Sequence, residues 1–277
     1  MAKVSMKLLT DLIHDEYKKS NIQVSVKKNP VYHVSPLINL TSEQQKILSD
    51  GDGQTEDQYK QINSSTGLAV NYYKILEELA SITDLIFENK IAKPLNKGGR
   101  FANLDVSYKK NGVLHYVESK FLEPYYSGNE TIKDSYLDIS KYPVEVEENK
   151  EEWRNLFNKA SEFEYYNFSQ LCRHLLALYR YTHGIKGSEY KGEQVVLQSV
   201  TWEMTPQFMK KLDQKNSIDM QKRIEQLQDE ANRCQEIFNA FISNIGWNNM
   251  KFQTLHYNDM LDDIKSSKHY AEFCKRY

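Results

Sequence analysis

Three residues of reactive type lie near the middle of the chain: Asp105, Glu118 and Lys120. Two carboxylates can share a divalent cation, and Mg²⁺ favours one or two carboxylates together with water and phosphate oxygens. A lysine ammonium beside such a pair can neutralise it when no cation is bound, and it can orient or deprotonate a water molecule. These residue types therefore point to a cation site with a basic group that acts on water.

A predicted β-hairpin brings these residues together. The dipeptide Asn111-Gly112 joins two alternating runs, and Asn-Gly is a strong hairpin signal because both central positions of a type I′ turn need φ above zero. With a two-residue loop, counting outward from the turn places Asp105 opposite Glu118, with Cβ atoms about 5 Å apart. Lys120 shares the face of Glu118 because side chains alternate along a strand, and Asn103 lies opposite Lys120.

The other face of the hairpin should meet the core, because it is mostly apolar. It carries Ala102, Leu104, Val106, Val117 and Phe121, with Ser119 as a polar interruption. Like charges directly across a hairpin destabilise it by up to roughly 1 kcal/mol, which a shared cation would offset. The alternative is a solvated polar face, on which Asp, Glu and Lys are common. A longer loop would also move Asp105 out of line with Glu118.

The spacing of these residues resembles a known nuclease signature. Asn103-Leu104-Asp105, then twelve residues, then Glu118-Ser119-Lys120 is similar to the aspartate and (D/E)-x-K of the PD-(D/E)XK nuclease superfamily. The string NLDVSY…YVESKFLEPY resembles a bacterial restriction-endonuclease-like branch in which an aromatic residue and a glutamate follow the lysine, as Phe121 and Glu123 do here. The resemblance covers about residues 64–205 and departs from the pattern at Leu104, which replaces the name-giving proline.

The resemblance implies a restriction-endonuclease-like α/β core, in which helices flank a mixed central sheet. It also implies a phosphodiesterase that uses Mg²⁺ or Mn²⁺. Asp105 and Glu118 would bind the metal, together with the Ser119 carbonyl. Lys120 would position the attacking water and stabilise charge on the pentavalent phosphate. The metal would lower the pKa of its water.

Two more site residues follow from the resemblance. Gln170, in the segment QLCRH, resembles the glutamine on a helix of the exonuclease-like members, and Arg173 or His174 would reach a phosphate. The alternative for Gln170 is a half-buried polar position on a core helix. An acidic residue is also expected on the helix before the hairpin. Of Glu77 and Glu78 we favour Glu78, with a salt-bridged surface residue as the alternative.

The overall charge does not favour nucleic-acid binding. The formal net charge of the 277 residues is -2, whereas a nucleic-acid binder is often basic overall. A phosphate-binding surface must therefore be local. Lys90, Lys93, Lys97 and Arg100 precede the hairpin and could form it, unless they only line a solvated loop.

The elements that position the site are read from apolar spacing and turn residues. The predicted helices cover about 3–19, 66–89, 151–183 with a break near Glu164, a region from Pro206 onward, and 258–277. The predicted strands cover 193–204 and 251–257. This order predicts a mixed α/β domain with helical additions at both ends. We expect an N-terminal helical or irregular arm over 1–63, a nuclease core over 64–205, and a C-terminal helical region with a late strand over 206–277.

The segment from Met220 to Ile245 has apolar residues at alternating gaps of four and three. This heptad-like seam packs either against the same chain or against a second copy in a homodimer. Cys172, Cys234 and Cys274 are dispersed, which favours a reducing cytoplasm. We see no signal peptide, no apolar run near the ~20 residues of a membrane span, and no P-loop, zinc or acyl-transfer motif.

The leading hypothesis is a DNA endonuclease of restriction or defence type. Cutting both strands usually needs two sites, which favours a homodimer. An exonuclease or repair nuclease is a second hypothesis, favoured by Gln170. The third is a nucleic-acid-binding scaffold that keeps the fold without chemistry, although an intact Asp105, Glu118 and Lys120 argues against it.

Overall fold

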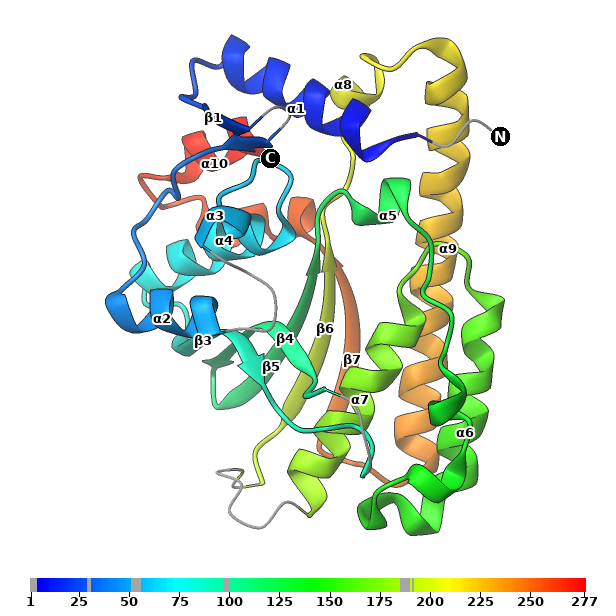
Figure 1. Cartoon of the computed structure of the whole chain (residues 1–277). Helices are drawn as coiled ribbons and strands as arrows, with labels where there is room; N and C mark the ends of the chain where they lie inside the picture. The colour runs from blue at the N-terminus through cyan, green and yellow to red at the C-terminus, as the bar shows by residue number, and fades with distance from the viewer. Residues whose placement is uncertain (1–3, 29–30, 51–55, 97–99, 185–189, 191) are drawn as a thin grey trace.

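A five-stranded mixed sheet forms the centre of the molecule in the computed structural model, which describes residues 4–28, 31–50, 56–96, 100–184, 190 and 192–277 (Figure 1). Its strands, in spatial order, are β3 (Thr83–Lys90), β4 (Asn103–Lys110), β5 (Val113–Lys120), β6 (Val195–Thr201) and β7 (Met250–His256). The pairs β3–β4 and β4–β5 are antiparallel, whereas the pairs β5–β6 and β6–β7 are parallel. Helices flank this sheet, which confirms the predicted α/β fold class.

The register of the β4–β5 hairpin is the predicted one. Five pairs are formed, from Lys110 opposite Val113 to Val106 opposite Val117. Asn111 and Gly112 make the turn with φ of 52° and 79°, the positive values that a type I′ turn requires. The short loop therefore fixes which residues face each other.

The predicted helix over 66–89 is wrong in its second half. Helix α4 (Ser65–Glu78) begins after Ser64, whose hydroxyl accepts the N–H of Gly67, and the chain then turns through Ala80 at φ 54° into strand β3. The spacing of Ile82 and Ile86 fits a helix, but the segment is rich in β-branched and aromatic residues that suit a strand. Pairing with β4 satisfies its backbone groups.

The sheet is covered on both faces (Figure 1). On one face lie α4 and the 3-10 helix η5 (Tyr257–Ile264): Ser119 Oγ contacts the Ser65 carbonyl at 3.3 Å and the Tyr257 hydroxyl at 2.9 Å. On the other lie α7 (Phe168–His183) and α9 (Gln214–Asn244), where the rings of Phe238 and Phe252 are 4.6 Å apart. Side chains on either face of β5 are therefore enclosed.

The segment between the hairpin and α7 is built of short helices. They are α5 (Glu123–Tyr126), η1 (Asp134–Tyr136), η2 (Ile139–Lys141), η3 (Val144–Asn149), α6 (Lys150–Asn158) and η4 (Lys159–Glu162). The expected break near Glu164 is confirmed, because the predicted helix over 151–183 is divided into α6, η4 and α7. The predicted strands over 193–204 and 251–257 correspond to β6 and β7.

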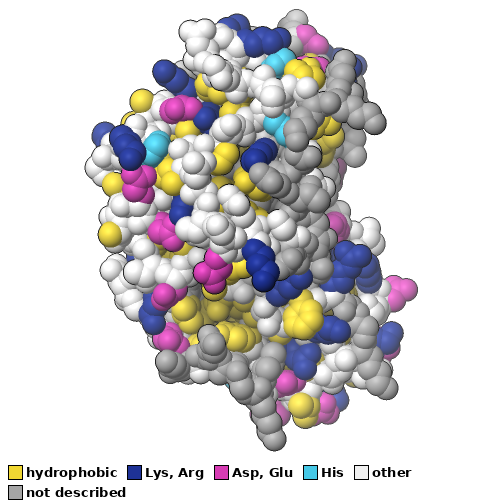
Figure 2. Space-filling view, turned by 60° about the vertical axis from the view of Figure 1, so that its left-hand side comes forward, with side chains coloured by type: hydrophobic (Ala, Val, Ile, Leu, Met, Phe, Trp, Pro, Cys, Tyr) yellow, Lys and Arg dark blue, Asp and Glu magenta, His cyan; other side chains and the backbone are white. Residues whose placement is uncertain are grey.

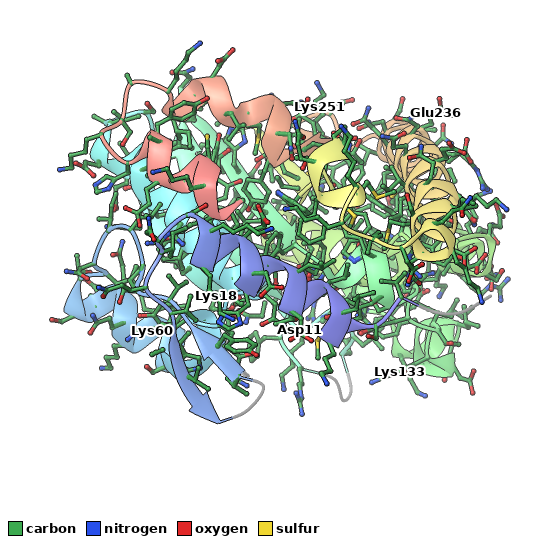
Figure 3. All side chains as sticks on the ribbon, turned by 90° about the horizontal axis from the view of Figure 1, so that it is seen from above. Asp11, Lys18, Lys60, Lys133, Glu236 and Lys251 are labelled. Carbon is green, nitrogen blue, oxygen red and sulfur yellow. The ribbon has the colours of Figure 1, made fainter. Side chains whose placement is uncertain are left out.

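In place of the predicted terminal helix over 258–277, the chain forms two short elements, η5 and α10 (Tyr270–Arg276). A short helix, α8 (Pro206–Met209), precedes α9. The first 63 residues carry α1 (Met6–Lys19), β1 (Ser25–Lys28), β2 (Val31–His33), α2 (Ser42–Asp50) and α3 (Glu56–Tyr59). Seen from above, α1, with Asp11 and Lys18, lies across the molecule (Figure 3). Within the described ranges, no helix has both the length and the apolar character to cross a membrane.

The heptad-like seam of α9 packs within the chain. Its buried members include Cys234, Phe238 and Phe241, and the Phe241 ring lies 4.6 Å from that of Trp153 on α6. Of the two alternatives that the sequence leaves open, these contacts correspond to packing against the same chain. A homodimer would therefore have to use a surface other than this apolar seam.

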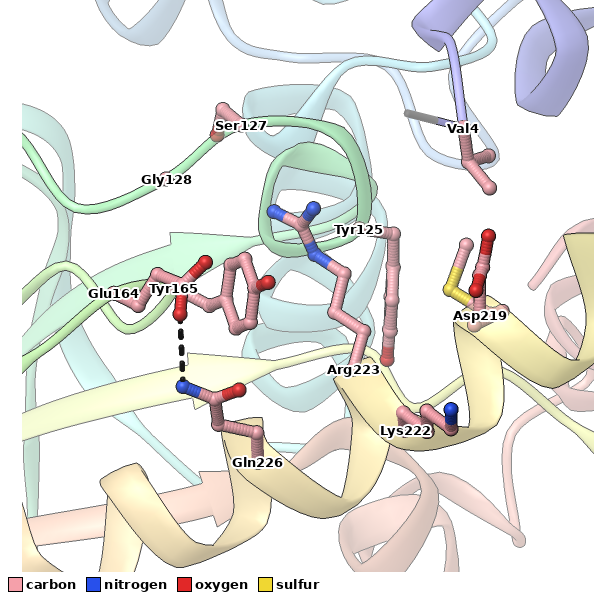
Figure 4. A pocket seen from close by; sticks show the side chains of 11 residues that line it. Val4, Tyr125, Ser127, Gly128, Glu164, Tyr165, Asp219, Lys222, Arg223 and Gln226 are labelled. Atoms are coloured by element: carbon pink, nitrogen blue, oxygen red, sulfur yellow. Dashed lines mark hydrogen bonds between the residues drawn. The ribbon is translucent and has the colours of Figure 1, made fainter. Parts of the chain in front are cut away.

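Polar contacts tie α9 to the segment before α7 (Figure 4). The buried Glu230 carboxylate accepts the N–H groups of Glu164, Tyr165 and Tyr166 at 3.0, 2.9 and 2.8 Å. The Arg223 guanidinium lies 4.0 Å from the Tyr165 ring centre, and its Nε donates to the Pro124 carbonyl at 2.7 Å. Since residue 168 begins α7, these contacts help to position that helix against the sheet.

Candidate active site

Three carboxylates come from three neighbouring strands: Glu88 from β3, Asp105 from β4 and Glu118 from β5. Pairs on either side of Glu88, Phe87 with Val106 and Asn89 with Leu104, place it level with Asp105. The charge of Glu118 raises the pKa of both Glu88 and Asp105, and the charge of Glu88 raises the pKa of Asp105, so the three groups lie close enough to interact. We call these three residues the carboxylate cluster.

Asp105 lies where the regular pairing of the hairpin ends. Its Oδ2 accepts the Ser119 N–H at 2.6 Å, so the carboxylate takes the place of a backbone acceptor. The N–H and C=O of one strand residue point to the same side, which directs the Ser119 carbonyl toward β4 as well. The neighbouring Lys120 carbonyl instead accepts the Trp202 N–H at 2.8 Å.

Glu118 is held between two cationic or donor groups. Its Oε1 lies 2.6 Å from Lys120 Nζ, and its Oε2 lies 2.9 Å from His174 Nε2 on α7. Burial of this side chain, which is 2% exposed, raises its pKa, but Lys120 and His174 outweigh burial and hold the pKa at about 2. Burial likewise lowers the pKa of Lys120, yet the Glu118 and Glu123 carboxylates keep it above its usual value. Both groups are therefore charged near neutral pH.

The other two carboxylates behave differently. Burial, and then the Glu118 charge, raise the pKa of Glu88 to about 7, although hydrogen bonds from Asn103 Nδ2 and, at 3.5 Å, Thr66 Oγ1 favour its charged form. Burial followed by the charges of Glu118 and Glu88 raises the pKa of Asp105 well above its usual range. Lys120 can balance the charge of one carboxylate only, so ionisation of all three would leave negative charge uncompensated.

This donor set fits a hard divalent cation, which prefers carboxylate and carbonyl oxygens. Carboxylate oxygens from adjoining strands and the Ser119 carbonyl would supply the ligands. As the side chains stand in the described part of the chain, no three His, Cys, Asp or Glu residues are gathered tightly enough to ligate one ion. One physical reason is that Lys120 and His174 engage both oxygens of Glu118.

Helix α7 presents the predicted Gln170 to a cavity beside the cluster. Gln170 Oε1 accepts from Asn167 Nδ2 at 3.3 Å, and Arg173 Nη2 forms an ion pair with Glu130 at 2.7 Å. His174, one helical turn beyond Gln170, turns instead toward Glu118. Gln170 therefore lines the approach to the cluster, and His174 joins the cluster itself.

The structure does not bring Glu78 to the cluster. It ends α4 and pairs with Lys268 at 2.8 Å and His269 at 3.3 Å, with a side chain 37% exposed, and Glu77 pairs with Lys74. The acidic residue beside Asp105 is Glu88, which the sequence analysis missed. A strand assignment over 83–90 would have revealed it, because Glu88 is then the acidic residue level with Asp105.

A cavity of about 980 Å³ opens beside the cluster. Asn103, Gln170 and His174 are among its lining residues, and so are basic residues at Arg100, Lys133, Lys141 and Arg173, against one acidic residue, Glu130. Figure 2 shows Lys and Arg side chains gathered on the lower part of one face of the molecule. A local basic surface therefore exists on a chain whose net charge is -2.

The predicted basic segment contributes to this cavity in part. Arg100 lines it, and so does Phe101, which is 48% exposed and has Lys93 Nζ 5.5 Å from its ring centre. Lys90 ends strand β3, and Lys97 lies outside the described residues. A second cavity of about 470 Å³, between α5, residues 164–165 and α9 (Figure 4), is lined by none of the cluster residues.

The central sheet and the helices on its two faces define a restriction-endonuclease-like α/β core. The chain belongs to the family described as "Restriction Endonuclease associating with ARP", whose model matches residues 10–277. No curated protein and no solved structure matched the chain. Membership of a restriction-endonuclease family implies nuclease activity and a role in defence.

Proposed function

We propose that the chain is a metal-dependent PD-(D/E)XK nuclease that hydrolyses DNA phosphodiester bonds as a restriction or defence endonuclease. The observation that carries the proposal is the contact of Lys120 Nζ with Glu118 Oε1 at 2.6 Å beside Asp105. A lysine that carboxylates keep charged, beside carboxylates whose full ionisation needs a further positive charge, suits hydrolysis of a phosphodiester with a divalent cation.

Mg²⁺ or Mn²⁺ would be held by Asp105, Glu118 and the Ser119 carbonyl, with Glu88 as a further carboxylate nearby. The chemistry that such a cation supplies is activation of water near neutral pH and neutralisation of phosphate charge. Both Glu118 oxygens are engaged without it. Lys120 Nζ would have to leave Glu118 Oε1 for that oxygen to hold a cation.

The freed Lys120 ammonium would then serve the reaction. Its side chain is 17% exposed, so part of it is accessible to solvent. An ammonium has three donors, which suits it to orient the attacking water and to stabilise charge on the pentavalent phosphate. His174 and the Ser119 N–H would keep the Glu118 and Asp105 carboxylates in place.

DNA would approach through the basic cavity. Its four cationic residues, Arg100, Lys133, Lys141 and Arg173, supply the local attraction for phosphates that the net charge of -2 does not. Phe101 offers an exposed aromatic ring on which a base can stack. The family description names association with ARP, and we propose that this chain also acts beside such a partner.

An exonuclease or repair nuclease is the second candidate, and the observation that favours it is Gln170 on the cavity wall. A nuclease that needs an end shortens linear DNA but leaves covalently closed circles intact, whereas an endonuclease cuts both. If the enzyme cuts both strands as a homodimer, the dimer interface lies outside the buried seam of α9.

The test uses the purified full chain with supercoiled plasmid, linear DNA, and Mg²⁺, Mn²⁺ or EDTA. We expect cleavage that needs the metal and is lost in Lys120→Ala. Lys110→Ala is the matched control, because Lys110 lies at the turn of the same hairpin and pairs with Asp263. Binding of DNA with no cleavage in either metal, on both substrates, would leave only the scaffold hypothesis.

A further inference from the structure

His174 is buried at the carboxylate cluster, next to buried leucines of its own helix. It is 4% exposed and follows Leu171 on α7, with Leu175 and Leu178 beyond it. Its Nε2 contacts Glu118 Oε2 at 2.9 Å, while its Nδ1 is buried with no hydrogen-bond partner among the described residues. A buried polar atom without a partner is costly, so packing alone does not account for a histidine here.

The roles of the two ring nitrogens follow from the partner. An ionised carboxylate only accepts hydrogen bonds, so Nε2 carries the hydrogen in its contact with Glu118. In a neutral imidazole the other nitrogen is then an acceptor. His174 is one of the residues that line the cavity beside the cluster, and its buried Nδ1 is then an acceptor without a partner among the described residues.

Asn103 has the same arrangement on the other side of Asp105. Its Nδ2 donates to Glu88 Oε2, and its Oδ1 is buried without a partner among the described residues. Asn103 also lines the cavity. Two residues that line the same cavity thus each hold one carboxylate of the cluster through a donor and keep one buried acceptor without a partner among the described residues.

Two unused acceptors beside carboxylates suit a ligand that brings hydrogen-bond donors and positive charge. A hydrated divalent cation does both, and Mg²⁺ in proteins usually keeps several of its water molecules. An anion such as phosphate would instead place its oxygens against acceptors. The chemistry therefore favours water molecules around a cation as the partners of His174 Nδ1 and Asn103 Oδ1.

We propose that His174 is a positioning residue that fixes Glu118 for a divalent cation and, together with Asn103, accepts hydrogen bonds from water molecules around that cation. This inference rests on the proposed nuclease function. It assigns His174 a task distinct from that of Lys120. When Lys120 leaves Glu118 Oε1, His174 is the donor that keeps the carboxylate in place through Oε2.

Three substitutions separate this role from packing. His174→Leu keeps an apolar volume but removes both nitrogens. Gln carries a nitrogen donor near the position of Nε2, so His174→Gln can still hold Glu118. His174→Asn carries its amide near the position of Nδ1 and is too short to reach Glu118. His183→Gln is the matched control, because His183 lies on the same helix, against the Tyr179 and Trp247 rings.

The first measurement is Mn²⁺ binding by calorimetry without DNA, and the second is the Mg²⁺ concentration that gives half-maximal cleavage. Loss of a partner that orients a metal ligand typically costs 10–100-fold in metal affinity. We expect a loss of about that size in His174→Leu and His174→Asn, a smaller loss in His174→Gln, which keeps the donor to Glu118 but lacks the Nδ1 acceptor, and no change in His183→Gln. The half-maximal Mg²⁺ concentration should rise in the same variants, with KM for DNA unchanged.

The results also distinguish failure of this inference from failure of the proposed function. Cleavage by the wild type, with unchanged Mn²⁺ affinity in His174→Leu, overturns the inference alone. Mn²⁺ binding that depends on His174, without cleavage of any DNA, overturns the nuclease proposal and supports the cation role. No Mn²⁺ binding by the wild type overturns both. If His174→Leu does not fold, equal affinities in His174→Gln and His174→Asn overturn the inference.

Discussion

The Asp105 carboxylate accepts the backbone N–H of Ser119 at 2.6 Å across the β4–β5 hairpin. This contact lies just beyond the last regular pair, Val106 with Val117. The Asp105 side chain therefore takes the place of the next backbone acceptor of β4. The contact holds the Asp105 carboxylate where the regular pairing of β4 with β5 ends. The same contact sets Asp105 beside Glu118 and directs the Ser119 carbonyl toward the cluster.

Asp105→Asn should remove activity without removing structure. The amide oxygen of Asn can still accept the Ser119 N–H, so the hairpin keeps its contact, but the charge for a cation is lost. We expect cleavage to fall at least about 100-fold, the typical cost of losing one preorganised electrostatic group. The midpoint of thermal unfolding in EDTA should not fall, because the substitution also removes repulsion from Glu118 and Glu88. A fall of several degrees would contradict the assigned role of the charge.

Divalent cations should stabilise the folded chain. Lys120 can balance only one of the three carboxylates, so a cation would stabilise the charged forms of the others. A ligand that binds only the native state adds about 2.7 kcal/mol at a hundred times its Kd. We expect Mn²⁺ to raise the unfolding temperature of the wild type relative to EDTA. The increase should disappear in Glu118→Gln and persist in Glu78→Gln, since Glu78 pairs with Lys268 away from the cluster. An increase of the same size in Glu118→Gln would show that the cation binds elsewhere.

Glu88→Gln should stabilise the metal-free protein in a pH-dependent way. The folded-state pKa of Glu88 is raised to about 7 by burial and the Glu118 charge, so the folded chain holds this proton more tightly than the unfolded chain. Stability is then highest below the unfolded pKa and is lost as pH rises toward 7. At pH 8 the penalty approaches about 3 kcal/mol.

Urea unfolding in EDTA at pH 5 and pH 8 measures this effect. We expect Glu88→Gln to be more stable than the wild type at pH 8 and close to it at pH 5. Glu78→Gln again provides the surface control. Equal differences at both pH values would mean that Glu88 does not carry the buried charge. Cleavage should fall in Glu88→Gln if this carboxylate contributes to the cation site.

Binding to DNA should depend on the basic cavity and on salt. Replacing Lys133 and Lys141 by Ala removes two cationic residues of its lining. If both contact phosphates of duplex DNA, the slope of log K against log salt should become shallower by about 1.8. Fluorescence anisotropy without divalent cations measures this slope. Lys222→Ala, in the other cavity, should leave it unchanged, and an equal effect there would argue against a specific DNA surface.

Local sequence signals were sufficient where one short-range rule dominates. Asn111-Gly112 fixed the hairpin register, because a two-residue loop leaves no freedom in pairing. Apolar periodicity located α9, and its alternating gaps marked the residues that pack inward. The same periodicity failed at residues 79–90, where the apolar residues fit both a helix and a strand. Ala80, with its positive φ, gave no sequence signal for the end of α4.

The sequence by itself determined the hairpin, and thus that Asp105, Glu118 and Lys120 lie within reach of one another, because these residues are positioned by one turn. Only the tertiary structure decided what surrounds them. Glu88 joins the cluster through pairing of β3 with β4, and His174 reaches Glu118 from a helix 56 residues further along the chain. Such contacts depend on how separate elements pack. Burial raises the pKa of both Glu88 and Glu118, and only at Glu118 do the contacts with Lys120 and His174 outweigh burial and lower the pKa.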